Sequence, residues 1–344
     1  MPFANDLIDS NRERLEEKGI ARLQSRFLFD PAQVMALLRA RIVGQDAVLE
    51  QVESLLKVVK ADIGERERPL SVNLFMGPTG VGKTEIVRLL AQAIHGRPDA
   101  FCRIDMHTLA QEHYAAALTG APPGYVGSKE GATLFDAEAI QGSYSRPGIV
   151  LFDELEKASK DVLRSLLGVL EHGQLTLAAG TRTLDFRNSL IFMTSNIGAR
   201  EVTDYRARFE HGWRCWLGLS PQDEARIIEG ELHRHFEPEF LNRIDRILGF
   251  QRIEDEWLQV LLEIELGKLN QRLGRQGRVL LLDESAQDFL CREHDVRFGA
   301  RSMVRRLRLE LEPALADCLL ADPSIIRLLA RVEDGQLRIE ADIP

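Results

Sequence analysis

The sequence lacks the features of several protein classes. Its four cysteines, Cys102, Cys215, Cys291 and Cys318, are widely separated and show no CxxC spacing. This pattern argues against a zinc site and a disulfide framework, and fits a reducing compartment. No apolar run approaches the roughly 18 residues of a membrane span, and no apolar stretch with a small-residue cleavage site marks a secretory signal near the N-terminus. We therefore expect a soluble, cytoplasmic protein without a membrane partner.

Net positive charge is also missing. The formal charge is −9, which argues against retention on nucleic acid by the overall field of the protein and disfavours nucleic acid as a partner. The remaining composition is that of an ordinary globular protein, with 44% apolar and 28% charged residues. A length of 344 residues predicts about two domains.

Short, continuous apolar runs alternate with helical patterns through the first two thirds of the chain. Runs of this kind are typical of strands covered on both faces, so they predict a parallel sheet between two helical layers, an α/β fold. Beyond about residue 248 helical patterns dominate and end in one probable strand at 335–343. We predict a helical extension at 1–33, a large α/β domain at 34–248 and a smaller, mainly helical domain at 249–344. The runs lie at 71–76, 101–106, 148–153 and 189–196.

Residues 77–84 read GPTGVGKT and match the phosphate-binding pattern GxxxxGK[ST]. Backbone N–H groups of such a loop cradle phosphate oxygens, Lys83 reaches the outer phosphates and the Thr84 hydroxyl can ligate Mg²⁺. The alternative is a glycine-rich turn with a chance lysine, which the preceding strand and the following helix disfavour. The sequence therefore predicts an ATP–Mg²⁺ site. Its phosphate-binding residues are Gly77, Pro78, Thr79, Gly80, Val81, Gly82, Lys83, Thr84 and Glu85.

Two acids follow the apolar run at 148–153. Asp153 is predicted to hold Mg²⁺ through its water shell, and Glu154 to polarise the attacking water as general base. A helix-capping role for both acids is the alternative. Asn196 follows the run at 189–196 and is predicted to orient water near the γ-phosphate, with a simple turn asparagine as the alternative.

A loop with an unexplained aromatic lies between the phosphate loop and these acids. Residues 120–127 read GAPPGYVG, whose prolines and glycines exclude a regular helix. Nothing local explains why a tyrosine and a valine stand at its tip. The tip residues are Gly124, Tyr125, Val126 and Gly127.

These segments, in their order and spacing, closely resemble the Clp group of AAA+ unfoldases, which includes ClpA, ClpB and ClpC. The likeness covers most of residues 35–344 and is greatest for the C-terminal ATPase module of the two-ring members. It implies a six-membered homo-oligomeric ring, unfolded protein substrates and a helical domain that covers the nucleotide. The matching segments are RIVGQDAV, GPTGVGKTE, RIDM, GAPPGYVG, IVLFDELEKA, DFRNSLIFMTSNIGA, FEPEFLNRID and VRFGARSM.

The resemblance also implies residue roles. Asn196 would be the first nucleotide sensor, Arg301 the second, and Arg243 an arginine finger reaching the neighbouring subunit's nucleotide. Tyr125 would line a central pore and grip polypeptide. Composition alone would leave both arginines as surface residues. The adenine would contact the segment IVGQ at 42–45, which includes Val43, Gly44 and Gln45.

Three points remain open in the sequence. Leu217, Gly218 and Leu219 stand where protease-coupled relatives carry a docking loop for a peptidase ring, but packing in a core is equally compatible. The segment at 1–30 has no evident counterpart in the family and is a candidate for binding a partner or adaptor. The ATPase residues themselves fit an unfoldase, a nucleic-acid motor or an ATP-gated scaffold, and the GYVG loop favours the first.

Overall fold

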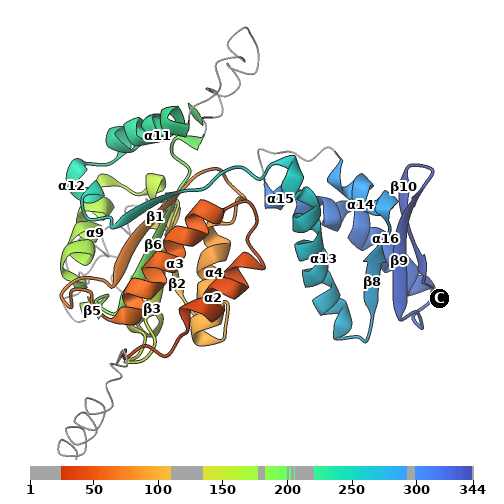
Figure 1. The fold of residues 1–344 in the computed structure, drawn as a ribbon, viewed down its shortest axis with the longest axis horizontal. Helices are drawn as coiled ribbons and strands as arrows, with labels where there is room; N and C mark the ends of the chain where they lie inside the picture. Colours follow the sequence, from red (N-terminus) through yellow and green to blue (C-terminus); the bar gives the residue numbers. More distant parts are fainter. Residues whose placement is uncertain are drawn as a thin grey trace, which may run out of the picture.

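The computed structural model describes residues 25–109, 135–176, 183–199, 201, 202, 205, 221–292 and 299–342, without the side chains of 221–225. A five-stranded sheet forms the centre of the large domain (Figure 1). Its strands run parallel in the order β2-β3-β6-β1-β7. The strands are β1 (Ser71–Met76), β2 (Cys102–Asp105), β3 (Gly148–Asp153), β6 (Ser189–Ser195) and β7 (Arg246–Gly249).

Four of these strands coincide with the predicted apolar runs, and the α/β fold is confirmed. Every residue of β1, β3 and β6 is buried, which is why their sequences show no alternation. The fifth strand, β7, was not predicted. It lies at the sheet edge and buries only Leu248, so its sequence carries almost no apolar signal.

Helices cover both faces of this sheet. One apolar cluster joins one face to α2 (Pro31–Arg39), α3 (Asp46–Ala61) and α4 (Lys83–His95). A second cluster joins the other face to α9 (Lys160–His172), α11 (Pro221–His235) and α12 (Pro238–Leu241). Shorter elements complete the domain: α5 (Met106–Leu109), α8 (Ala137–Gln141), a 3₁₀ turn (Leu155–Lys157) and the hairpin of β4 (Gln174–Thr176) and β5 (Thr183–Asp185).

The first described helix, α2, begins after a capping aspartate, with proline at its first position. The Asp30 carboxylate accepts a hydrogen bond from the backbone N–H of Ala32 at 3.0 Å, and Pro31 occupies the first turn. Phe27 is buried in the cluster under α2 and α3. Most of the predicted extension at 1–33 lies outside the described residues.

The smaller domain packs helices against a three-stranded sheet. In this sheet β8 pairs parallel with β9, and β9 pairs antiparallel with β10. The predicted final strand corresponds to β10, whereas β8 and β9 were not predicted. Its elements are a 3₁₀ turn (Asp255–Trp257), α13 (Leu258–Gly274), β8 (Val279–Leu282), α14 (Glu284–Cys291), α15 (Ala300–Arg306), a π-helical turn (Leu307–Leu311), α16 (Glu312–Ala321), β9 (Arg327–Glu333) and β10 (Gln336–Ala341).

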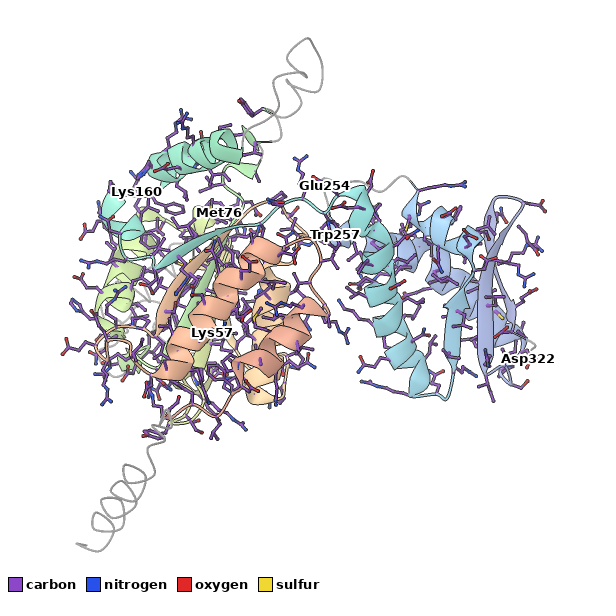
Figure 2. All side chains as sticks on the ribbon, in the orientation of Figure 1. Lys57, Met76, Lys160, Glu254, Trp257 and Asp322 are labelled. Carbon is purple, nitrogen blue, oxygen red and sulfur yellow. The ribbon has the colours of Figure 1, made fainter. Side chains whose placement is uncertain are left out.

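The segment after β7 connects the two sheets and is clamped by Gln45. The Gln45 amide group donates to the backbone carbonyl of Gln251 at 2.9 Å, and its oxygen accepts from the Gln251 N–H at 3.0 Å. Gly44 has a φ of 66°, and a Cβ there would approach the Trp257 ring at 3.1 Å. Figure 2 shows Trp257 and Glu254 at this junction. The domain limits at 33/34 and 248/249 stay a prediction.

None of the described helices has the length and apolar character needed to cross a membrane.

Candidate active site

The phosphate loop connects β1 to α4 through a turn that only glycine accommodates easily. Gly77 and Gly82 have φ values of 139° and 106°, in the region that disfavours residues with a side chain. A Cβ on Gly77 would also lie 2.6 Å from the Phe250 carbonyl oxygen. The loop therefore keeps its shape because glycine stands at these positions, and α4 begins with its N-terminus facing the loop.

Lys83 is buried beneath this loop. Its ammonium group donates to the carbonyl oxygens of Gly77 and Pro78 and, at 2.7 Å, to the Oδ1 atom of Asn196. Burial lowers the Lys83 pKa to about 8, and the negative charges of Glu156 and Asp153 oppose that shift. The lysine is thus held at the loop by hydrogen bonds that phosphate oxygens can replace.

Asp153 and Glu154 line the same cavity although they are consecutive in the chain. Side chains alternate between faces along a strand, but Glu154 adopts a left-handed conformation with φ 58° and ends that alternation. Thr194 on β6 holds both residues. Its hydroxyl donates to Asp153 Oδ1 at 2.5 Å and accepts from the Glu154 N–H at 3.0 Å.

Replacing Thr194 by valine removes both hydrogen bonds and should therefore lower ATP hydrolysis about tenfold, because neither acid is then held in place. Phosphate release measures the rate, and urea unfolding should show a loss of about 1–3 kcal/mol from the unpaired buried oxygen. Thr194→Ser keeps the hydroxyl and should retain most activity. Equal activity of the valine and wild-type proteins would contradict this role of Thr194.

The second carboxylate oxygen of Asp153, Oδ2, contacts Arg103. Arg103 on β2 donates to Asp153 Oδ2 through Nε at 3.1 Å and through its terminal nitrogen at 2.6 Å. Thr84 and Asp153 both border the cavity, and a hydroxyl with a carboxylate suits Mg²⁺. These two residues would hold the ion, which would neutralise phosphate charge during hydrolysis. Arg103 would then share Asp153 with the hydrated ion.

Asn196 is oriented by an acid that follows Glu154 by two residues. The backbone N–H and the side-chain amide of Asn196 both lie 3.3 Å from Glu156 Oε1. Because Asn196 Oδ1 accepts from Lys83, the amide group is fixed from both ends. This places a polar side chain from the end of β6 beside Lys83. Its predicted role of orienting water near the γ-phosphate stays a prediction.

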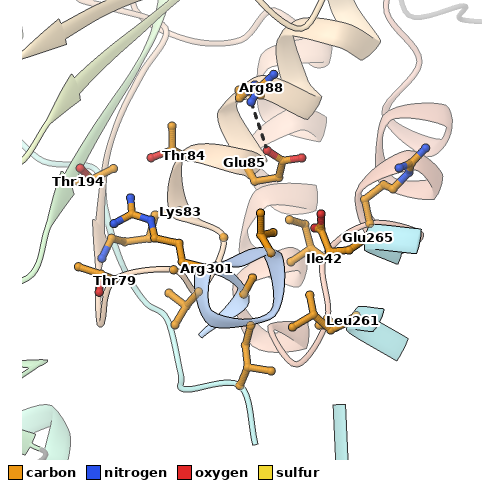
Figure 3. A pocket seen from close by; sticks show the side chains of 18 of the residues that line it. Ile42, Thr79, Lys83, Thr84, Glu85, Arg88, Thr194, Leu261, Glu265 and Arg301 are labelled. Carbon is orange, nitrogen blue, oxygen red and sulfur yellow. Dashed lines mark ion pairs between the residues drawn. The ribbon is translucent and has the colours of Figure 1, made fainter. Parts of the chain in front are cut away.

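The second domain closes the cavity from the opposite side. The Ala300 N–H donates to the Gly80 carbonyl at 2.9 Å, and Lys268 on α13 approaches Glu85 at 3.5 Å. Arg301 borders the cavity, and Figure 3 shows it with Lys83 and Thr84 around one space. The cavity has a volume of about 690 Å³, enough for a nucleotide. Predicted site residues on its wall are Val43, Thr79, Gly80, Val81, Gly82, Lys83, Thr84, Glu85, Asp153, Glu154, Asn196 and Arg301.

Other predicted site residues stand apart from this wall. Gly44 and Gln45 serve the domain junction, and Gly77 and Pro78 contribute carbonyls to Lys83. Arg243 is not among the residues that border the cavity. Its guanidinium instead donates to Glu171 Oε1, at the C-terminal end of α9, at 2.8 Å. The predicted pore residues 124–127 and docking residues 217–219 lie outside the described residues.

Sequence reasoning did not identify three residues that shape the site: Arg103, Glu156 and Thr194. Each stands within a segment that the sequence analysis singled out for another reason. Arg103 precedes the end of β2, where polar groups of a parallel sheet converge, so its position was a usable signal. The contacts of Glu156 and Thr194 cross between segments some 40 residues apart and leave no local pattern.

Comparison with known proteins agrees with this geometry. Residues 68–247 match the family described as AAA domain (Cdc48 subfamily), and residues 253–325 match the C-terminal, D2-small domain of ClpB protein. The chain is 47% identical over 368 residues to the ATP-dependent protease ATP-binding subunit-like protein AmiB of Pseudomonas aeruginosa. That alignment covers 98% of this chain and 99% of the relative.

Two further relatives extend the comparison. An ATP-dependent protease ATP-binding subunit-like protein of Rhodococcus erythropolis is 40% identical over 318 residues, 91% of each chain. The ATP-dependent Clp protease ATP-binding subunit ClpC of Staphylococcus aureus is 37% identical over 284 residues, which are 82% of this chain and 34% of that relative. With its phosphate loop, paired acids and covering domain, the chain belongs to the Clp group of AAA+ ATPases.

Proposed function

We propose that this ATPase unfolds proteins as a homo-oligomeric, six-membered ring that threads polypeptide through a central pore. The observation that carries the proposal is the GAPPGYVG loop at 120–127, placed between the phosphate loop and the paired acids. Leu109 and Phe135 flank the segment that contains it, and both are buried in the core of the large domain. Both flanking residues thus belong to the core of the domain that binds the nucleotide.

Tyr125 suits this task physically. An aromatic ring can contact the apolar and backbone surface of a polypeptide without requiring a particular sequence. This property suits a protein that acts on varied unfolded substrates. Nucleotide-driven domain motion can move a loop flanked in this way. Tyr125 and its neighbours Gly124, Val126 and Gly127 would therefore form the substrate-binding loop.

The residues at the cavity take the following proposed roles. Lys83 and Arg301 bind the phosphates, and Thr84 and Asp153 hold Mg²⁺. Glu154 accepts a proton from the attacking water, which Asn196 orients. Arg243 serves the nucleotide of the neighbouring subunit, because it does not border the cavity of its own chain.

The names of the relatives favour a protease partner. All three are described as ATP-binding subunits, or proteins like them, of an ATP-dependent protease. We propose that Leu217, Gly218 and Leu219 contact a peptidase ring, with packing inside the protein as the alternative outcome. A cytoplasmic location agrees with such a partner.

A substrate trap tests the proposed function. The Glu154→Gln protein, incubated with ATP in cell extract, should retain polypeptides that mass spectrometry identifies. A preparation with ADP in place of ATP is the control for adhesion. Retention of nucleic acid would support a nucleic-acid motor instead, and retention of one folded partner without unfolded chains would support an ATP-gated scaffold.

The pore role of Tyr125 makes a separate prediction. Tyr125→Ala should leave basal ATP hydrolysis near the wild-type rate but abolish unfolding of a fluorescent model substrate, because the loop loses its grip while the ATPase residues stay intact. Loss of substrate fluorescence measures unfolding. Tyr144→Ala is a matched control, since Tyr144 is 79% exposed on the same domain outside this loop. If Tyr125→Ala unfolds the substrate at the wild-type rate, the pore assignment is wrong.

A further inference from the structure

Arg68 lies just before β1 and reaches the segment that carries Arg243. Its terminal nitrogen is 3.4 Å from the Arg243 carbonyl oxygen and 3.2 Å from Asp245 Oδ1. The two contacts join one guanidinium to both ends of a three-residue stretch. Arg68 therefore holds the backbone of the Arg243 segment and leaves the Arg243 side chain untouched.

Asp245 completes this connection. Its second carboxylate oxygen accepts from the Val72 N–H at 2.7 Å, and its own N–H donates to the Val72 carbonyl at 2.9 Å. The Arg243 segment is thereby fixed to the start of β1. The same strand leads at its other end into Gly77 and the phosphate loop. One strand thus links the Arg243 segment to the site where its own chain binds nucleotide.

The Arg243 guanidinium has one ion-pair partner among the described residues, whereas Asp245 in the backbone segment is bonded both to Arg68 and to Val72. Arg243 and Glu171 are each about a third exposed, and the Arg243 Nε is buried with no hydrogen-bond partner among the described residues. Exposed pairs of this kind contribute little to stability and exchange readily. The guanidinium can therefore leave Glu171 for a phosphate, while its backbone stays where Arg68 and Asp245 hold it.

We propose that Arg68 is a positioning residue that fixes the backbone at 243–245, so that Arg243 reaches the nucleotide of the neighbouring subunit. This inference rests on the proposed role of Arg243 across the subunit interface. It assigns to Arg68, which does not border the cavity of its own chain, a contribution to hydrolysis in the adjacent site.

Arg68→Ala should lower ATP hydrolysis by about 100-fold, the loss expected when a catalytic group is misplaced by about 1 Å. Binding of a fluorescent ATP analogue should be unchanged within twofold. Arg68→Lys keeps one charged contact but loses the second, so it should fall between these limits. Arg246→Ala is the matched control, because the Arg246 side chain contacts Ser71 at 3.4 Å across the same pair of strands. It should retain hydrolysis within twofold.

Rings that contain two variants distinguish a loss of Arg243 positioning from a general loss of structure. Arg68→Ala subunits mixed with Glu154→Gln subunits should regain activity, as we also expect of an Arg243→Ala mixture, since new interfaces join an intact base to an intact finger. Arg68→Ala mixed with Arg243→Ala should gain nothing. Copurification of differently tagged subunits establishes mixing.

Three outcomes would overturn the inference. If Arg243→Ala is rescued and Arg68→Ala is not, Arg68 has no positioning role and the proposed function stands. If Arg246→Ala loses as much activity as Arg68→Ala, loosened strand pairing explains the loss. If neither variant is rescued in rings shown to be mixed, the interface role of Arg243 fails and the Arg68 inference fails with it.

Discussion

Glu154→Gln should bind ATP and hydrolyse it at least about 100-fold more slowly than the wild-type protein, the usual cost of losing a general base. Glutamine has the shape of glutamate but cannot accept the proton of the attacking water. The backbone at this position should not move, because the Glu154 N–H donates to Thr194 and that contact does not involve the changed atoms. Loss of rate without loss of affinity is therefore the expected signature.

Single-turnover phosphate release and titration with a fluorescent nucleotide measure the two quantities separately. Asp161→Asn provides a control for the removal of one negative charge nearby, since Asp161 is an exposed acid on α9, the helix that follows the paired acids. It should hydrolyse ATP at the wild-type rate. Turnover of the Glu154→Gln protein near the wild-type value would show that another group activates the water.

The sequence identified the parts of the site that are local in the chain. The phosphate loop is one continuous segment, and its glycines reveal a backbone that requires positive φ. The strands β1, β3 and β6 were recognisable because burial on both faces demands continuous apolar residues. Where a structural requirement and the residues that meet it lie in one continuous segment, the sequence alone was enough to predict the structure.

What the sequence did not indicate depends on pairing between distant segments. Arg68 and Asp245 are 177 positions apart, and Arg243 and Glu171 are 72 apart. Each of these side chains is an ordinary polar residue in its own segment. The edge strand β7 illustrates the same limit, since one buried residue and a neighbour on one side leave its pattern weak.

The resemblance to Clp proteins supplied the role of Arg243, and the structure adds a physical argument for its direction. A residue that acts on the nucleotide of its own chain should border that cavity, as Lys83 and Arg301 do. Arg243 does not border the cavity and pairs instead with Glu171 at the end of α9. If Arg243 acts on the neighbouring subunit, two inactive variants should restore activity when they are mixed. An arginine that acts within its own chain would not give this result.

Arg243→Ala should reduce ATP hydrolysis by about 10³-fold or more, as expected when an arginine that stabilises transferred phosphoryl charge is removed. Nucleotide binding should persist because the cavity wall is unchanged. Mixed with Glu154→Gln subunits, the inactive protein should regain activity, since some interfaces then combine an intact Glu154 with an intact Arg243 from the neighbour. Phosphate release measured across mixing ratios should pass through a maximum, although each parent alone is nearly inactive.

Glu171→Gln is a useful companion variant, because it weakens the resting partner of Arg243 without changing the arginine. It should hydrolyse ATP far better than Arg243→Ala if the guanidinium acts on the neighbouring nucleotide and contacts Glu171 only at rest. Activity that never rises above the sum of the two parents, in rings shown by copurification to be mixed, would contradict a finger that acts between subunits. Arg243 would then have to work through Glu171 and α9 within its own chain, where that pair connects it to the helix that follows Glu154.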